Sequence, residues 1–238
     1  MQGRRSKIAL LAGILGGLAL FDIVFGPLLI KLGVLSPMNG FRYVFGIGVL
    51  EGLVALPLGL IGLFVTRAAT GAGGRNLAWL GVGAGATIFA LVAANALPPV
   101  PPINDITTNT DDPPVFAADP SGGDRDMTYP PGFAELAREA YPDLAPIELA
   151  AAPAEAFRKA KRAAQSLGWE ITAVRAESGE LEAEEVSALF QFVDDVAVRV
   201  RPNGTGSVID IRSKSRDGQS DLGANAARIR RFRDALTR

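Results

Sequence analysis

The sequence predicts a membrane protein with a soluble domain: three transmembrane helices, then an α+β domain with a four-stranded antiparallel sheet and two helices on one face. Three observations lead to this fold class. Apolar residues make up 48% of the chain, and in the first hundred residues they form three long runs. The chain then turns polar at the proline-rich stretch 98–102. From Pro153 on, a helical pattern, four alternating segments and a second helical pattern follow each other.

The three apolar runs cover about residues 8–34, 41–66 and 77–97, within a transmembrane region 1–98. Each is near or above the ~20 residues that a helix needs to cross ~30 Å of hydrocarbon. The first run is much longer than the roughly 7–15 residues of a signal-peptide core. Residues 36–40 have the composition of a tight turn, which predicts an antiparallel hairpin between the first two spans. Glycines at 13–17 and 81–85 favour close helix packing.

Basic residues near the span ends predict the orientation in a bacterial inner membrane. Five of them would lie on one side, and only Lys31 and Arg42 would lie on the other. The five are Arg4, Arg5, Lys7, Arg67 and Arg75. We therefore expect a cytoplasmic N-terminus and a periplasmic C-terminal domain from about residue 98 onward. The alternative topology has the domain inside.

The intramembrane polar candidates are Asp22, Glu51 and Asn95, which lie within the predicted spans. Charged residues at such depth are unfavourable enough to be functional candidates by default. One interpretation is a shared proton or a cation site between two antiparallel helices. The other is a carboxyl kept neutral by desolvation, or hydrogen-bonded to Asn95 or a backbone carbonyl, or matched by a partner's cation. Three spans without repeats favour the second, because they are few for a transport pathway.

Composition excludes several classes of site. The chain has no Cys and no His, so it forms no disulfide, zinc finger, His-ligated haem or Ser-His-Asp triad by itself. Seven basic and two acidic residues lie in residues 1–100, and 17 basic and 23 acidic residues lie beyond, a balance that predicts no nucleic-acid partner. The acidic cluster around Asp111 lacks EF-hand spacing and is interpreted as turn-capping. We predict no metal and no cofactor.

The polar half divides into an extended Pro- and Asp-rich segment, 99–150, packed on a soluble domain, 151–238. A short helix is expected at 133–140 within the segment. The domain should begin with a helix from Pro153 that ends at Gly168. Four strands are expected at 169–174, 179–186, 192–201 and 207–214. The last helix, 222–236, has Leu222, Ala226, Ile229, Phe232 and Leu236 on one stripe, with Ser220 or Asp221 as its cap.

Along the predicted strands, charged residues alternate with the apolar residues that face the two helices. The charged residues should therefore line the opposite face of the sheet. The segment from Asp210 to Asn225 runs into the last helix, where free amides near Arg212 and Arg216 favour an anion site. The alternative is internal: a cap residue occupies the amides and the arginines pair with neighbouring aspartates. The candidate ligand- or partner-binding residues are Asp194, Asp195, Arg199, Arg212, Ser213, Ser215, Arg216, Asp221 and Asn225.

Several short motifs follow one another in the polar half: Ile103-Asn-Asp-Ile-Thr-Thr, Asp112-Pro-Pro-Val-Phe116, Gly168-Trp-Glu, Leu181-Glu-Ala, Phe190-Gln-Phe-Val-Asp-Asp195, Val198-Arg-Val-Arg201 and Asp210-Ile-Arg-Ser-Lys-Ser-Arg216 to Asn225. In this order they resemble the bacterial and plastid family called domain of unknown function 1499. The resemblance covers about residues 100–237 and leaves the spans outside. It implies an envelope-facing or lumenal domain attached to a membrane, without a settled activity. Asn109 departs from the pattern, since family members often carry Asp there.

These observations predict a non-catalytic envelope protein whose outer domain binds a partner protein, an anionic ligand or membrane lipids. An accessory or assembly role in a larger membrane complex is a further hypothesis, in which basic residues of the last helix contact the partner. The alternative from another class is a hydrolase that uses Asp194 and Asp195 as acid–base groups, although adjacent residues of a strand point to opposite faces. No catalytic residue is assigned.

Overall fold

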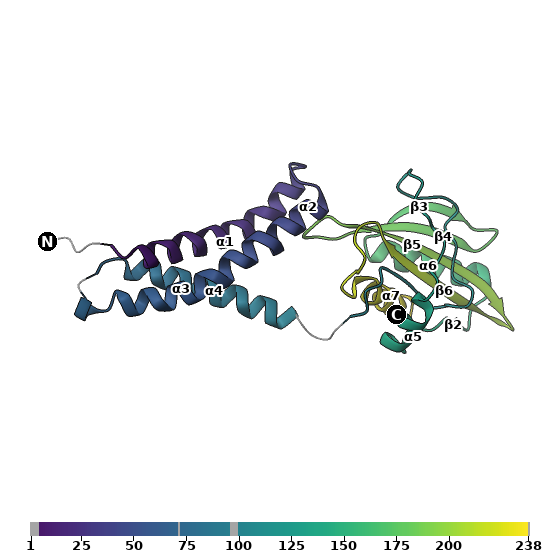
Figure 1. The fold of residues 1–238 in the computed structure, drawn as a ribbon. Coiled ribbons are helices and arrows are strands. Elements are labelled where there is room, and N and C mark those ends of the chain that lie inside the picture. The colour runs from purple at the N-terminus through teal and green to yellow at the C-terminus, as the bar shows by residue number, and fades with distance from the viewer. Residues whose placement is uncertain (1–4, 71, 96–99, 238) are drawn as a thin grey trace. The chain divides into compact units, whose positions relative to one another are not determined.

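A computed structural model describes residues 5–70, 72–95 and 100–237, without the side chains of Ala69 and Asn95. Figure 1 shows the order of the elements along the chain. Two compact units are distinguished, and each is described separately below. The transmembrane unit comprises the apolar helices before residue 100, and the α+β unit comprises residues 100–187 and 192–237. The predictions that concern Arg4, residues 96–99 and Arg238 lie outside the described residues.

The transmembrane unit contains three helices that are long and apolar enough to cross a bilayer, which indicates an integral membrane protein. The first is α1 (Lys7–Lys31), the second is a continuous helix over 37–65, and the third is α4 (Arg75–Asn95). A short 3₁₀ turn, η2 (Ala68–Thr70), lies between the second and third helices. Glycines allow these helices to approach closely, since a Cβ on Gly81 would lie 2.8 Å from the Cβ of Ala12.

The second span begins earlier than the sequence predicted, because residues 37–40 are helical and do not form a tight turn. The Ser36 hydroxyl accepts a hydrogen bond from the backbone amide of Asn39 at 3.4 Å, and Pro37 occupies the first helical turn. A serine cap followed by proline is a helix start, which turn composition alone did not reveal. The helix consists of α2 (Pro37–Arg42), the π-helical segment η1 (Tyr43–Gly48) and α3 (Val49–Val65).

The α+β unit is built on a six-stranded antiparallel sheet with the order β1-β6-β5-β4-β3, in which β2 also pairs with β6. The four predicted strands are β3 (Glu170–Arg175), β4 (Glu180–Val186), β5 (Val193–Asn203) and β6 (Gly206–Ser215). The prediction of four strands was too low, because β1 (Asp105–Thr107) and β2 (Ile147–Leu149) both pair with β6. Three-residue strands carry too little alternation to be recognised from sequence.

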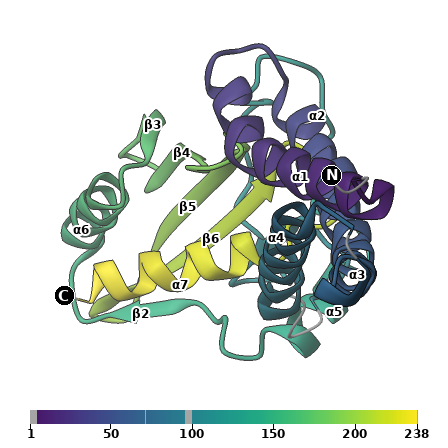
Figure 2. The ribbon, with the colours of Figure 1, turned by 90° about the vertical axis from the view of Figure 1, so that its left-hand side faces the viewer.

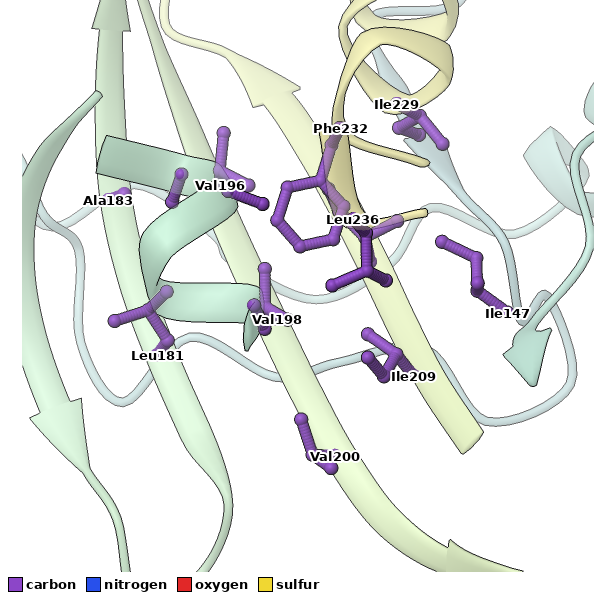
Figure 3. Close-up of a cluster of buried hydrophobic side chains, with 14 of the residues drawn as sticks. Ile147, Leu181, Ala183, Val196, Val198, Val200, Ile209, Ile229, Phe232 and Leu236 are labelled. Carbon is purple, nitrogen blue, oxygen red and sulfur yellow. The ribbon is translucent and has the colours of Figure 1, made fainter. Parts of the chain in front are cut away.

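Both α6 (Pro153–Ser166) and α7 (Ala224–Leu236) cover one face of the sheet, and Figure 2 shows α7 in front of β5 and β6. The short helix α5 (Phe133–Ala140) joins the same core through Ala137. Figure 3 shows the core side chains from the strands meeting those of α7, including Phe232. The ring of Phe232 stacks on Trp169 with 5.3 Å between centroids.

Leu222 does not belong to the apolar stripe of the last helix, contrary to the prediction. It precedes α7, is 68% exposed and has a φ of 52°. Gly223, with a φ of 85°, follows it and leads into the helix at Ala224. The two consecutive left-handed residues turn the chain before the helix starts, so the side chain of Leu222 leaves the stripe that Ala226 and Ile229 continue.

Candidate functional site

Strand parity divides the candidate residues between the two faces of the sheet. On β5, Val196 and Val198 belong to the core, so Asp194 faces the helices and Asp195 faces the opposite side. On β6, Ser213 and Ser215 face the helices with Ile211, whereas Arg212 faces away. The predicted set is therefore not one constellation but two clusters, one on each face of the sheet.

The cluster on the helix-covered face is centred on Arg228 of α7, which is 3% exposed. Its guanidinium donates to Asp194 Oδ2 at 2.5 Å, to Glu185 Oε2 at 2.5 Å and to Ser213 Oγ at 2.9 Å. Asn225 Oδ1 accepts from the same guanidinium at 2.5 Å. We call these five residues the Arg228 cluster. Burial opposes ionisation of Glu185, but its pairs with Arg231 and Arg228 lower its pKa below the usual range.

The N-terminal amides of α7 are already occupied by a side chain of the chain itself. Asp221 accepts hydrogen bonds from the backbone amides of Gly223 at 2.9 Å and Asn225 at 2.7 Å. Burial raises the pKa of Asp221, and the two amide bonds partly offset this rise. The side-chain amide of Asn225 donates to Ser215 Oγ and to the carbonyl of Asn104, each at 3.0 Å. The internal cap that the sequence offered as an alternative is thus present.

On the opposite face, Arg212 is enclosed by the extended segment that precedes α5. Its guanidinium binds both carboxylate oxygens of Asp105, at 2.8 Å and 2.7 Å, and both side chains are at most 1% exposed. The carbonyls of Pro114 and Met127 accept two further hydrogen bonds from it, at 3.2 Å and 2.9 Å. The rings of Phe116 and Tyr129 lie 5.2 Å and 5.4 Å from the guanidinium carbon. Burial, with the Asp105 carboxylate, raises the pKa of Tyr129 to about 12.

The other charged residues of this face are also paired. Asp195 accepts from Arg125 at 2.6 Å and from Arg216 at 2.7 Å, and Arg216 also pairs with Glu184. Arg125 in addition pairs with Asp119 and holds the pKa of that carboxyl far below its usual range. Further pairs among the described residues are Arg199–Asp210, Arg201–Asp210, Arg199–Asp112, Arg201–Asp112, Lys214–Asp105, Arg175–Glu180 and Arg175–Glu182.

The charged residues among the predicted ligand residues form hydrogen bonds or ion pairs within the unit. Arg212 and Arg216 have carboxylate partners within the unit, so neither guanidinium is directed at open space. Asp194 and Asp195 lie on opposite faces, and each is paired with an arginine, which separates the two carboxylates proposed for hydrolysis. Among the described residues, no group of three or more acidic side chains is arranged to hold a metal ion.

Sequence analysis did not single out Arg228, Asp105 or Glu185, although they organise the two clusters. Arg228 was grouped with the exposed basic residues of the last helix, and Asp105 with the turn-capping aspartates. A helical spacing of three places Arg228 beside Asn225, which was a weak signal for a shared buried face. Nothing local marks Asp105, because its partner Arg212 lies 107 residues away.

A basic surface remains on α6, where Arg158, Lys159, Lys161 and Arg162 follow one another around the helix. Lys159 and Arg162, three residues apart, line an open groove of about 590 Å³ beside the end of α7. Apolar and small residues complete the groove: Leu149, Ala163, Ser166, Ala235, Leu236 and Thr237. Glu155 pairs with one of these cations, since its carboxylate lies 3.6 Å from the Lys159 ammonium. Among the described residues, Arg162 has no ion-pair partner within 4.0 Å.

In the transmembrane unit, two of the three predicted polar residues meet. Asp22 is 3% exposed and lies against Gly48, which is one helical turn before Glu51. Tyr43, which sequence analysis did not name, donates from its hydroxyl to Asp22 Oδ1 at 2.5 Å. The side chain of Asn95 lies outside the described part of the chain.

Comparison with known proteins identifies a family for the polar half of the chain. The sequence profile described as "Protein of unknown function (DUF1499)" matches residues 105–236. The match starts at β1 and ends at the last residue of α7, so it contains both charged clusters and every lining residue of the α6 groove except Thr237. It leaves out the apolar helices. No curated protein sequence matches the chain.

Proposed function

Because this chain belongs to the DUF1499 family of proteins of unknown function through residues 105–236, we propose its role from its geometry: a non-catalytic, membrane-anchored module that binds anionic lipid. The α6 groove is the observation that carries the proposal. It combines two cations with an apolar lining, which suits an anionic headgroup attached to an apolar chain. The sheet arginines Arg212 and Arg216 form ion pairs with carboxylates inside the unit. Arg162 has no ion-pair partner among the described residues.

The length of the connection supports a lipid ligand. Nine residues, 96–104, join α4 to β1, and an extended chain of this length spans at most about 35 Å. The α+β unit therefore operates within reach of the headgroups of the membrane that holds its anchor. Electrostatic attraction to anionic headgroups acts over about a Debye length, so it would add to binding of a basic helix held within that distance of the membrane.

We propose a non-catalytic role because the candidate acid–base carboxylates are paired with arginines. A general acid–base carboxyl needs access to a substrate, yet Asp194, Asp195 and Glu185 each accept from arginines inside the unit. Asp221, whose pKa is raised by burial, is committed to the amides of α7. Such networks rigidify the unit and favour a binding role over turnover.

We expect hydrogen–deuterium exchange of α6 to depend on anionic lipid. The full-length protein is reconstituted in nanodiscs of phosphatidylcholine, with or without phosphatidylglycerol, and exchange of the α6 peptide is followed by mass spectrometry. Anionic lipid should slow exchange over Pro153–Ser166. In Lys159→Ala/Arg162→Ala this protection should be lost, because each cation near an anionic surface contributes about 1 kcal/mol, or about thirty-fold in affinity for two.

A matched variant controls for net charge. Arg230→Ala/Arg233→Ala also removes two cations, but both of these arginines are held by Asp143, so protection of α6 should persist. Equal protection in both nanodiscs, or equal loss in both variants, would exclude anionic lipid as the ligand of the groove. Protection only in native membranes, together with one crosslinked protein at α6, would assign the groove to a protein partner.

We further propose that the N-terminus is cytoplasmic and the α+β unit periplasmic, in a bacterial inner membrane. The excess of Lys and Arg at the N-terminus and in the loop before α4 supports this orientation. Because the chain has no Cys, single substitutions report topology without background. Ser178→Cys, in the exposed β3–β4 turn, should react with a membrane-impermeant maleimide in spheroplasts. Ala68→Cys should react only after permeabilisation, and the reverse result would place the domain inside.

A further inference from the structure

A carboxyl pair lies inside the transmembrane unit, in a setting where two negative charges are strongly unfavourable. Asp22 is in the interior of α1, about 22 Å along the helix from Lys7 and about 13 Å from Lys31. Glu51 lies near the middle of the second span, 37–65. An ionised carboxylate at such depth is costly, and two adjacent carboxylates in a low-dielectric site do not both remain ionised.

A π-helical segment directs Tyr43 and Glu51 toward the same helix. Eight residues separate them, so in a regular α-helix their side chains would point about 80° apart. The segment Tyr43–Gly48 contains the wider i→i+5 turn, and the amide of Val49 donates to the carbonyl of Val44. Accommodating one additional residue in this turn reduces the angle to about 20°. Tyr43 and Glu51 therefore share the face that meets Asp22.

A glycine brings the two helices together at this point. Gly48 is buried at the end of the π-helical segment, and a Cβ placed on it would lie 3.0 Å from the Cβ of Asp22. Any larger residue would push α1 away from the second span where the carboxyl groups meet. The π-helical turn, Gly48 and the Tyr43 hydroxyl bond thus converge on the Asp22 carboxyl.

The hydrogen bonds around Asp22 and Glu51 fit a pair of carboxyl groups in which only one carries a proton. Tyr43 donates to Asp22 Oδ1 at 2.5 Å, which stabilises a negative charge on Asp22. Glu51 Oε2 is enclosed by the protein and has no donor among the described residues. Two ionised carboxylates are acceptors only, so Glu51 and Asp22 can form a hydrogen bond with each other only when one of the two carries a proton.

Other charged groups of the unit do not neutralise the pair. α4 packs against both helices and contributes no titratable side chain from residues 76–94. Arg42 precedes Tyr43 at the end of α2, and none of the salt bridges among the described residues involves it. Among the described residues of this unit, the remaining cations are at or beyond helix ends: Arg5, Lys7, Lys31, Arg67 and Arg75.

From this arrangement we propose that Asp22 and Glu51 form an intramembrane proton-binding site, in which one shared proton is held between the two carboxyl groups and Tyr43 orients Asp22. The ligand is a proton, because its binding completes the carboxyl–carboxyl hydrogen bond and removes one of two buried charges. The site belongs to the apolar helices that precede the DUF1499 match, so it is independent of lipid binding by α6.

Carbodiimide labelling tests the site. Dicyclohexylcarbodiimide reacts with protonated carboxyl groups in apolar surroundings, and the adduct is located by mass spectrometry of the full-length protein in nanodiscs. We expect a single adduct per chain, at Glu51 or Asp22, whose yield falls as the pH is raised. Asp22→Asn removes the neighbouring negative charge, so the labelling midpoint at Glu51 should move to lower pH by about one unit or more.

Tyr43→Phe should move the midpoint in the opposite direction. Without the hydroxyl, a negative charge on Asp22 loses its donor, and the pair should retain its proton to higher pH. Thr87→Val is the matched control, because it removes a hydroxyl that binds the carbonyl of Gly83 elsewhere in the unit at 2.9 Å. Its midpoint should equal that of the unaltered protein. A purely structural role of Tyr43 would change thermal stability but not the labelling midpoint.

Three results would overturn the proposal. The first is absence of an adduct on either carboxyl at every pH in the unaltered protein. The second is a labelling midpoint that is the same in Asp22→Asn, Tyr43→Phe and Thr87→Val. The third is suppression of labelling by sodium at constant pH, which would assign the pair to a metal cation instead of a proton.

Discussion

Replacing Asp105 by alanine is expected to destabilise the α+β unit by about 3–5 kcal/mol. The substitution leaves the guanidinium of Arg212, which is 1% exposed, without its carboxylate in a site closed to water. The two carbonyls and two aromatic rings around Arg212 remain, but they carry no compensating charge. Lys214, whose ammonium lies 3.2 Å from Asp105, loses the same partner.

Urea unfolding of the full-length protein measures this loss. Trp169 is a native reporter, since it is buried and stacked on Phe232, and a Trp79→Phe background removes the only other tryptophan. The control is Asp111→Ala, which breaks an exposed pair with Arg138 and should change the free energy of unfolding by less than about 1 kcal/mol. Similar values for both variants would mean that Arg212 finds another partner.

Replacing Arg228 by leucine is expected to have an effect of comparable size, about 3–5 kcal/mol. Leucine approximates the apolar stem of the side chain, so the change removes mainly the charge and five donors. Asp194 and Glu185 would lose a cation, and Ser213 and Asn225 would lose a donor, all on the face covered by α7. Leaving buried acceptors unpaired adds to the electrostatic loss.

Arg231→Leu is the control on the same helix. Arg231 also binds Glu185, at 2.9 Å, but its side chain is 50% exposed. Its loss should reduce the free energy of unfolding by less than about 1 kcal/mol. Both variants are measured by Trp169 fluorescence in the Trp79→Phe background. Equal effects of the two substitutions would show that burial of Arg228 is not what makes its ion pairs important.

Strong local periodicity explains the parts of the fold that were predicted well. The helix from Pro153, the four longer strands and the short helix at 133–140 were expected within a few residues of their positions. Each of these elements repeats its apolar residues over two or more periods. Three long apolar helices were expected for the same reason, because the bilayer requires an uninterrupted run.

Short or mixed signals explain the parts that were missed. Residues 37–40 contain both turn formers and a helix-start pattern, and the structure follows the helix start at Ser36 and Pro37. The strands β1 and β2 are three residues each and exist because β6 offers them an edge. Leu222 continues the apolar stripe in the sequence, but its left-handed backbone places it outside the helix.

For the candidate site too, local patterns predicted some features and missed those that depend on distant segments. Residue types and parity predicted correctly that Arg199, Arg212 and Asp210 face away from the helices. They did not predict which carboxylate each arginine would bind, since Arg212 and Asp105 are 107 residues apart. The α6 groove was also missed, because its lining comes from β2, α6 and α7, which local patterns treat separately.

The sequence by itself determined the division into apolar helices and an α+β unit, and the residues that the DUF1499 profile matches. Local hydrophobicity encodes these properties, since each depends on neighbours within a few residues. Tertiary structure alone decided the pairing of the buried charges, including Arg228 with Asp194 and Tyr43 with Asp22. Such pairs form only when folding brings distant segments together and excludes water from between them, and no local pattern specifies that contact.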